Sequence, residues 1–104
     1  MKKELRIGWT TLESRESAER LARELVGAGL ASCVQIEALS ASVYRWEGAV
    51  RLEPEWRLTV KFPAEKAVEL GALLEELHPY DCPQWIVVRP EHVSSGYLKW
   101  ATGQ

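Results

Sequence analysis

An alternation of apolar and polar side chains predicts that residues 49–62 form a β-strand covering a core with one face. The apolar positions are Val50, Leu52, Trp56, Leu58, Val60 and Phe62. Charged residues and one threonine occupy the other face. Residues 31–46 form a less regular apolar pattern just before it. We therefore predict one long β-hairpin over residues 31–62, with its turn at Glu47 and Gly48.

Two irregularities are expected within this hairpin. The apolar residues of 34–36 and of 44–46 share one parity, whereas those of 39–43 have the other. A bulge or bend at residues 39–42 reconciles the two halves. Pro54 cannot donate a ladder hydrogen bond, so the second arm should break, bulge or lie at an edge there. A hairpin this long extends beyond a small domain and needs cover, which another copy of the chain can supply.

A strand and an amphipathic helix precede the hairpin. Residues 4–10 alternate as a strand does, with Leu5, Ile7 and Trp9 on one side. Ser14 suits the N-cap of a following helix, and Gly29 suits its C-terminal stop. The stripe expected to be buried has helical spacing and consists of Ala18, Leu21, Ala22, Leu25 and Val26.

A second helix, a short strand and a last helix follow the hairpin. Pro63 can begin this second helix, which must end near His78 because Pro79 disfavours the α conformation in the residue before it. Its apolar stripe is Ala67, Leu70, Leu73, Leu74 and Leu77. The run over residues 84–89 indicates a strand buried on both faces, or one sealed by a partner. Residues 93–101 predict a short terminal helix that packs against the body.

The order of these elements predicts an α+β fold of the ferredoxin-like βαββαβ type, with a long central hairpin and a short C-terminal helix. Both main helices then lie on one face of a four-stranded antiparallel sheet. The other face is left bare, and such a face is covered by a partner or used for binding. The length of 104 residues suits a single domain over residues 1–104.

Composition narrows the classes of function and the partners. The net charge of -2 offers no basic excess for nucleic acid, and no apolar run approaches the roughly 20 residues of a membrane span. The first residues carry lysines without an apolar stretch after them, so we expect a cytoplasmic protein. Cys33 and Cys82 form no CxxC pair and are expected as reduced thiols. Five tryptophans in so short a chain favour oligomerisation.

The motifs of common catalytic sites are missing from the sequence. There is no glycine-rich phosphate loop, no GxSxG, no HExxH and no readable nucleophile–base pair, so we do not expect an enzyme. A zinc site would need His78, Cys82, Cys33 and His92 to be brought together by the fold, because structural zinc takes about four ligands.

Two interpretations of His78 remain open. It can be a C-terminal helix cap, where the helix dipole favours a protonated imidazole. Alternatively, its imidazole faces a cleft and binds a metal ion or a small anion. Tyr80, two residues further on, can pack or donate a hydrogen bond in the same cleft.

Five other polar and aromatic residues are candidates for a site or a subunit contact. Glu55 and Lys61 on the polar strand face are either solvated, or part of a pocket if another subunit covers that face. Cys33 fits an inert packed thiol. Tyr44 and Trp46, near the hairpin tip, can anchor a neighbouring chain.

Five segments in this order resemble the CutA family of divalent-cation tolerance proteins, across about residues 7–100. They are residues 30–36 (LASCVQI), residues 42–48 (SVYRWEG), Glu55 with Val60 and Lys61, residues 78–83 (HPYDCP) and residues 97–100 (YLKW). The resemblance implies a ferredoxin-like subunit, a tightly packed homotrimer whose hairpins pair across subunits, and a role in tolerance to copper or other divalent cations.

The resemblance also implies where the sites lie. The expected trimer contacts are Tyr44, Trp46, Trp56, Trp85 and Trp100. The expected cleft residues are Cys33, Gln35, Glu55, Lys61 and Tyr80. The architecture is similar to that of the PII signalling trimers, whose clefts between subunits bind small effectors, and this gives an alternative function.

The sequence departs from the family pattern at positions that bear on metal binding. Gln35 stands where the family has asparagine. Some members have a cysteine at the position of Trp9 and a histidine at that of Leu77, and these are proposed copper ligands. His78 is therefore the one metal ligand that the resemblance implies here, and copper favours imidazole and thiolate ligands.

Overall fold

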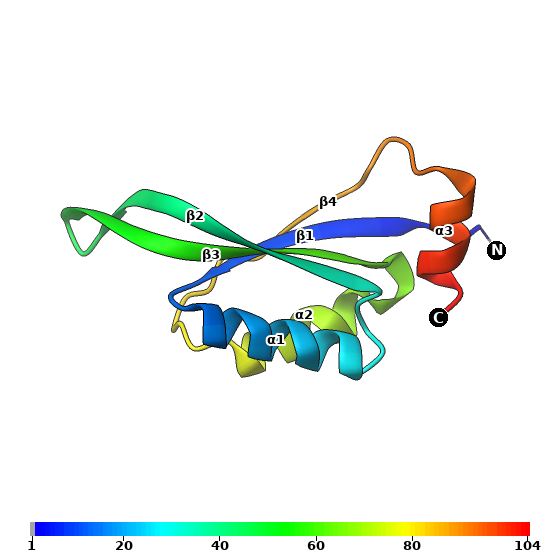
Figure 1. Ribbon diagram of the computed structural model, residues 1–104, viewed down its shortest axis with the longest axis horizontal. Coiled ribbons are helices and arrows are strands. Elements are labelled where there is room, and N and C mark those ends of the chain that lie inside the picture. Colours follow the sequence, from blue (N-terminus) through cyan, green and yellow to red (C-terminus); the bar gives the residue numbers. More distant parts are fainter. Residues whose placement is uncertain (1) are drawn as a thin grey trace.

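The computed structural model describes residues 2–104 and places two helices on one face of a four-stranded antiparallel sheet (Figure 1). The elements are β1 (Leu5–Leu12), α1 (Arg15–Gly27), β2 (Cys33–Trp46), β3 (Ala49–Pro63), a 3-10 turn (Ala64–Lys66), α2 (Ala67–Leu77), β4 (Ile86–Val88) and α3 (Ser95–Thr102). The strand order is β2-β3-β1-β4. The ferredoxin-like prediction is confirmed. None of the helices within residues 2–104 is long and apolar enough to cross a membrane.

The hairpin of β2 and β3 has the predicted turn and the predicted irregularity. Glu47 and Gly48 have φ angles of 50° and 79°, as a two-residue turn with right-handed strand twist requires. The register shifts between Leu39 and Ser42, which confirms the bulge. Pro54 lies opposite this shift and beyond the end of β1, whose last paired residue is Leu12. The missing N–H of Pro54 therefore costs no hydrogen bond to β1.

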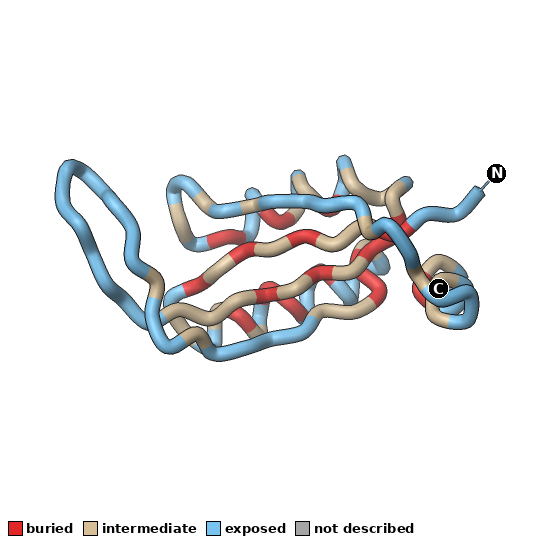
Figure 2. Tube along the Cα trace, turned by 90° about the horizontal axis from the view of Figure 1, so that it is seen from above, coloured by how far each residue is buried: buried red, intermediate tan, exposed pale blue. Residues whose placement is uncertain are grey.

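Only the stem of the hairpin is covered within the subunit. Leu58, Val60 and Phe62 are fully buried under the helices. Val50 and Leu52, on the same parity of β3, are about 70% exposed. The tip of the hairpin, residues 43–53, projects beyond both helices, and all of these residues are exposed (Figures 1 and 2). The alternation was predicted correctly, but two of the six apolar residues of this face have no cover in one subunit.

Helix α1 begins and ends at the predicted signals. The Ser14 side chain accepts a hydrogen bond from the Ser17 N–H at 3.1 Å, and Gly29 has a φ of 75° just after the helix. The predicted stripe is buried except at Val26, which is 41% exposed. The prediction for Val26 is wrong because its side chain lies beside the edge strand β2, where the sheet leaves a groove.

Helix α2 begins later than the sequence predicts. Pro63 pairs with Leu5 as the last residue of β3, and a 3-10 turn separates it from the helix. Pro63 therefore pairs with β1 as part of the sheet, although proline is also favoured in the first turn of a helix. Leu70 and Leu74 are fully buried, and the helix ends at the predicted residue, His78.

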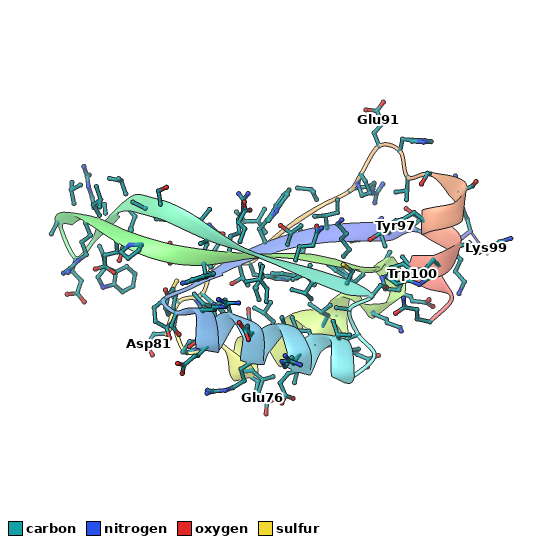
Figure 3. All side chains as sticks on the ribbon, viewed as in Figure 1. Glu76, Asp81, Glu91, Tyr97, Lys99 and Trp100 are labelled. Atoms are coloured by element: carbon teal, nitrogen blue, oxygen red, sulfur yellow. The ribbon has the colours of Figure 1, made fainter. Side chains whose placement is uncertain are left out.

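Strand β4 and helix α3 leave apolar surface exposed. The three residues of β4 are 37–51% exposed, so burial of this strand on both faces is wrong for a single subunit. The strand pairs with β1 alone and forms an edge of the sheet. In α3, Ala101 is buried and its carbonyl accepts a hydrogen bond from the Ser32 hydroxyl, whereas Trp100 lies exposed beside Tyr97 (Figure 3).

A tryptophan packs directly on the backbone of β1. Trp85 stacks on Phe62 with ring centroids 6.1 Å apart, and its ring lies over Gly8. A Cβ atom at Gly8 would come within 2.3 Å of this ring. Glycine is therefore required at this position for Trp85 to pack against the core.

We expect Gly8→Ala to lower the free energy of unfolding by about 1–3 kcal/mol, the usual range for overpacking a core. Urea denaturation at one fixed protein concentration measures the change. Gly27→Ala is the matched control, because a Cβ atom there meets nothing within 4 Å. It should leave stability unchanged or raise it by up to about 1 kcal/mol. Equal effects of the two substitutions would contradict the role assigned to Trp85.

Candidate functional site

A buried polar cluster connects the end of α2 to β1. His78 is the C-cap residue of α2 and is only 7% exposed. Its Nε2 atom lies 3.0 Å from the Thr10 hydroxyl and 3.0 Å from the Thr11 carbonyl oxygen. Its Nδ1 atom accepts a hydrogen bond from the Tyr80 N–H at 3.1 Å. Both ring nitrogens are therefore occupied by partners from the same chain.

These partners determine the protonation state of the His78 ring. A backbone carbonyl can only accept and a backbone N–H can only donate, so Nε2 carries the proton and Nδ1 does not. Burial lowers the pKa of His78, while the Thr11 carbonyl and the carboxylates of Glu13 and Glu55 partly oppose that effect. The expectation of a protonated imidazole at the helix end is wrong, because desolvation outweighs the helix dipole. The position of His78 as a helix cap is correct.

Tyr80 extends this cluster to β3. Its hydroxyl donates a hydrogen bond to Glu55 Oε2 at 3.0 Å, and its ring centroid lies 4.9 Å from that of His78. Burial and the neighbouring Glu55 carboxylate raise the pKa of Tyr80 well above its ordinary value. The hydroxyl therefore remains a donor throughout the physiological range. Tyr80 has both predicted roles, since it packs on His78 and donates to Glu55.

The other predicted cleft residues lie at the opposite end of the sheet. Cys33 and Lys61 are paired across β2 and β3, and the Lys61 amine lies 5.5 Å from the Tyr97 ring centroid. Gln35 is exposed and pairs with Thr59. Glu55 is six residues from Lys61 along β3, or about 20 Å at the usual strand rise. One subunit therefore does not gather the five predicted residues into one cleft.

A divalent metal ion does not fit the residues of one subunit. Within residues 2–104 no group of three or more histidine, cysteine, aspartate or glutamate side chains could hold one. Cys33 and Cys82 are free thiols, half-buried and exposed respectively. His78 offers no ring nitrogen unless it gives up an internal hydrogen bond. The four residues considered for zinc are not brought together.

The residues predicted for subunit contacts fall into two groups. Tyr44, Trp46 and Trp100 expose large apolar surfaces. Trp56 and Trp85 are half-buried and pack against the core of their own subunit. The indole N–H of Trp9 donates a hydrogen bond to the Thr59 hydroxyl at 3.1 Å.

The sequence did not identify Thr10 and Thr11 as partners of His78. Thr10 lies on the face of β1 that packs against the helices, and it is fully buried. A buried threonine hydroxyl on the core face of a strand needs a hydrogen-bond partner, so Thr10 itself could have indicated that a polar side chain lies near it. The partner itself is 68 residues away in sequence, so only the fold could reveal it.

Comparisons with known proteins agree with one another. Residues 6–104 match the family model of the CutA1 divalent ion tolerance protein. The divalent-cation tolerance protein CutA of Pyrococcus horikoshii is 34% identical over 94 residues, which cover 90% of this chain and 91% of that protein.

Solved structures give the same result. CutA1 from Ehrlichia chaffeensis superposes with a TM-score of 0.92 at 25% identity, covering 97% of this chain and 94% of the other. The periplasmic divalent cation tolerance protein CutA from Archaeoglobus fulgidus has a TM-score of 0.89 at 30% identity, with coverages of 93% and 94%.

We expect stability to fall when the pH is lowered from 7.5 to 5, partly because of His78. Its pKa is lower in the folded state than the value of about 6.5 for the unfolded chain, so the unfolded chain binds more protons on acidification. The contribution is complete above pH 6.5 and declines as the pH falls toward the folded pKa. Melting temperatures of His78→Gln should depend less on pH over this range. His92→Gln, at an exposed position, is the control and should keep the wild-type dependence.

We expect Tyr80→Phe to lower the free energy of unfolding by about 1 kcal/mol, because it removes the hydrogen bond to Glu55 and keeps the ring. Urea denaturation at matched protein concentration measures the difference. Tyr97→Phe is the control, since the Tyr97 hydroxyl has no hydrogen bond to any of residues 2–104. A control that loses as much stability as Tyr80→Phe would count against the Tyr80–Glu55 contact.

Proposed function

Because this chain belongs to the family of CutA1 divalent ion tolerance proteins, we propose that it acts in divalent-cation tolerance as a homotrimer. Family membership supports the role. The apolar surface that one subunit leaves exposed supports the assembly, and this observation carries the proposal. The related proteins are named for tolerance and not for a reaction, so we propose no catalytic activity.

The tip of the hairpin exposes several large apolar side chains. Val43, Val50 and Leu52 lie on one face of the tip and are 66–70% exposed, and Trp46, which pairs with Ala49, is 46% exposed on the other face. The subunit measures 47 × 26 × 21 Å, with the hairpin along the longest direction (Figure 1). Monomeric soluble proteins rarely expose contiguous apolar patches larger than roughly a few hundred Å². Exposed tryptophans commonly anchor interfaces. The tip therefore fits a contact with a neighbouring subunit.

The sheet has two different open edges that can pair with each other. The free edges of β2 and β4 present backbone N–H and C=O groups without strand partners. Pairing of β2 in one copy with β4 in the next is a head-to-tail contact, which closes into a ring at a suitable rotation. The resemblance to CutA proteins supplies the number of three.

Cation binding is proposed only where subunits meet. One subunit lacks three convergent ligands within residues 2–104, and both His78 nitrogens are occupied. We infer that a cation site combines side chains of neighbouring subunits. Copper is the first cation to test, because it favours the imidazole and thiolate groups that this chain can offer.

We propose that the protein works in the cytoplasm. Cys33 and Cys82 are free thiols, and Cys82 is exposed. A reducing compartment keeps such thiols from being oxidised. Fractionation of cells expressing the protein from its own promoter tests this location.

A second candidate function is the binding of a small effector between subunits, as in PII signalling trimers. The bare face of the sheet favours it, because Gln35 is exposed there and Cys33 and Lys61 are only half-buried. A thermal shift with metabolites, but not with copper, would distinguish this function from cation binding.

We expect Trp46→Ala to weaken assembly, because truncation of an aromatic interface anchor typically costs about 2 kcal/mol or more. Native mass spectrometry at low micromolar concentration should show more dissociated subunits than in the wild-type protein. Val68→Ala removes a side chain of α2 that is even more exposed, at 86%, and serves as the control. A Trp46→Ala protein that stays as trimeric as the control would exclude the hairpin tip from the interface.

We expect the wild-type trimer to take up copper in multiples of three, one per shared site. Native mass spectra with and without added copper and zinc give the stoichiometry. A trimer that stays free of metal would retain the assembly and remove direct cation binding from its function. Metal bound to isolated subunits would contradict the sharing of sites.

A further inference from the structure

A groove separates α1 from the edge strand β2. Its volume is roughly 740 Å³, within the range of about 300–1,000 Å³ that is typical of small-molecule sites. Residues of α1, β2 and β3 of a single subunit line it. It lies on the helix-covered face of the sheet, on the other side from Cys33 and Lys61.

The floor of the groove is apolar. Val34 and Ile36 pair with Val60 and Leu58 and share their orientation toward the helices. The two residues of β3 are fully buried, whereas Ile36 is 38% exposed, because α1 does not reach across the edge strand. Val26 forms part of the opposite wall, which explains its exposure. This is uncovered core surface in a concave setting.

The rim of the groove is formed by charged residues one turn apart along α1. The Arg15 guanidinium lies 6.0 Å from the Trp56 ring centroid, and its Nε donates to Glu19 Oε2 at 2.6 Å. Arg23 lies one turn beyond Glu19 and has no carboxylate oxygen within 4.0 Å among residues 2–104. Because Arg15 and Glu19 neutralise each other, Arg23 leaves the rim with one free positive charge.

We propose that this groove binds a small amphipathic anion. The apolar body of the ligand lies against Val34 and Ile36, and its single acidic group pairs with Arg23. Trp56, whose ring lies beside the Arg15 guanidinium, forms one end of the groove and packs against a flat ring or an alkyl chain of the ligand. Every lining residue belongs to one subunit, so this site does not depend on the proposed trimer or on cation binding.

The shape and the charge of the groove favour a small ligand over a neighbouring subunit. A subunit contact is expected on protruding apolar surface such as the hairpin tip and along the backbone edges of β2 and β4, whereas the groove lies on the helix-covered face of β2. The groove is concave and presents one free guanidinium, which suits a compact ligand with one negative charge. A second copy that covers the groove remains an outcome that the experiment can detect.

The test uses the full-length protein in its native assembly and the fluorescent probe 8-anilinonaphthalene-1-sulfonate, which joins an apolar ring system to one sulfonate. We expect saturable binding near one probe per subunit, and displacement of the probe by octanoate. Arg23→Gln should weaken probe binding about tenfold, the scale of one charge-assisted hydrogen bond. Arg20→Gln, on the same helix but outside the groove, should leave the affinity unchanged.

A second variant tests the floor without relying on Arg23. Ile36→Glu places a carboxylate in the groove at a position that is already partly exposed, and it should abolish saturable binding while circular dichroism shows an intact fold. Three results would overturn the proposal: no binding to the wild-type protein, as expected if a second copy covers the groove; equal affinity in Arg23→Gln and Arg20→Gln; or unchanged binding in Ile36→Glu. Native masses of the same samples show separately whether the trimer is present.

Discussion

The long hairpin needs more apolar cover than its own subunit can give. Strand β3 has 15 residues and spans about 45 Å, whereas α1 has 13 residues and spans about 20 Å, because a strand rises more than twice as far per residue as a helix. The helices therefore cover the stem and leave the tip bare. The exposed tip follows from this difference in length, and the proposed assembly supplies the cover that the tip lacks.

The cluster of His78, Tyr80 and Glu55 fixes the connection between α2 and β4 where the helix cover ends. The Nε2 atom of His78 contacts the Thr10 hydroxyl and the Thr11 carbonyl oxygen of β1, and Tyr80 joins β3 through Glu55. A histidine held in this way is neutral and has no free nitrogen, so its physical role is to hold the loop at Tyr80 against β1. The chain belongs to a family named for divalent-cation tolerance, and the proposed cation site lies between subunits because residues 2–104 of one subunit gather no set of three ligands.

Features that depend on local chemistry were predictable from the sequence. The alternation over residues 49–62, the bulge at 39–42, the turn and the Ser14 cap each follow from side chains within a few positions. Features that depend on distant packing were not. The exposure of Val26 depends on how far α1 extends across the sheet, and the neutral state of His78 depends on threonines 67 and 68 residues away.

The central claim is that neighbouring subunits cover the hairpin tip, and amide hydrogen exchange of residues 43–53 in the native assembly tests it most directly. A two-stranded hairpin is only marginally stable in water by itself. If neighbours cover the tip, its ladder amides should exchange as slowly as those of the buried stem around Leu58 and Val60. Tip amides that exchange within seconds while the stem stays protected would show that the tip is open to water, and would contradict the account.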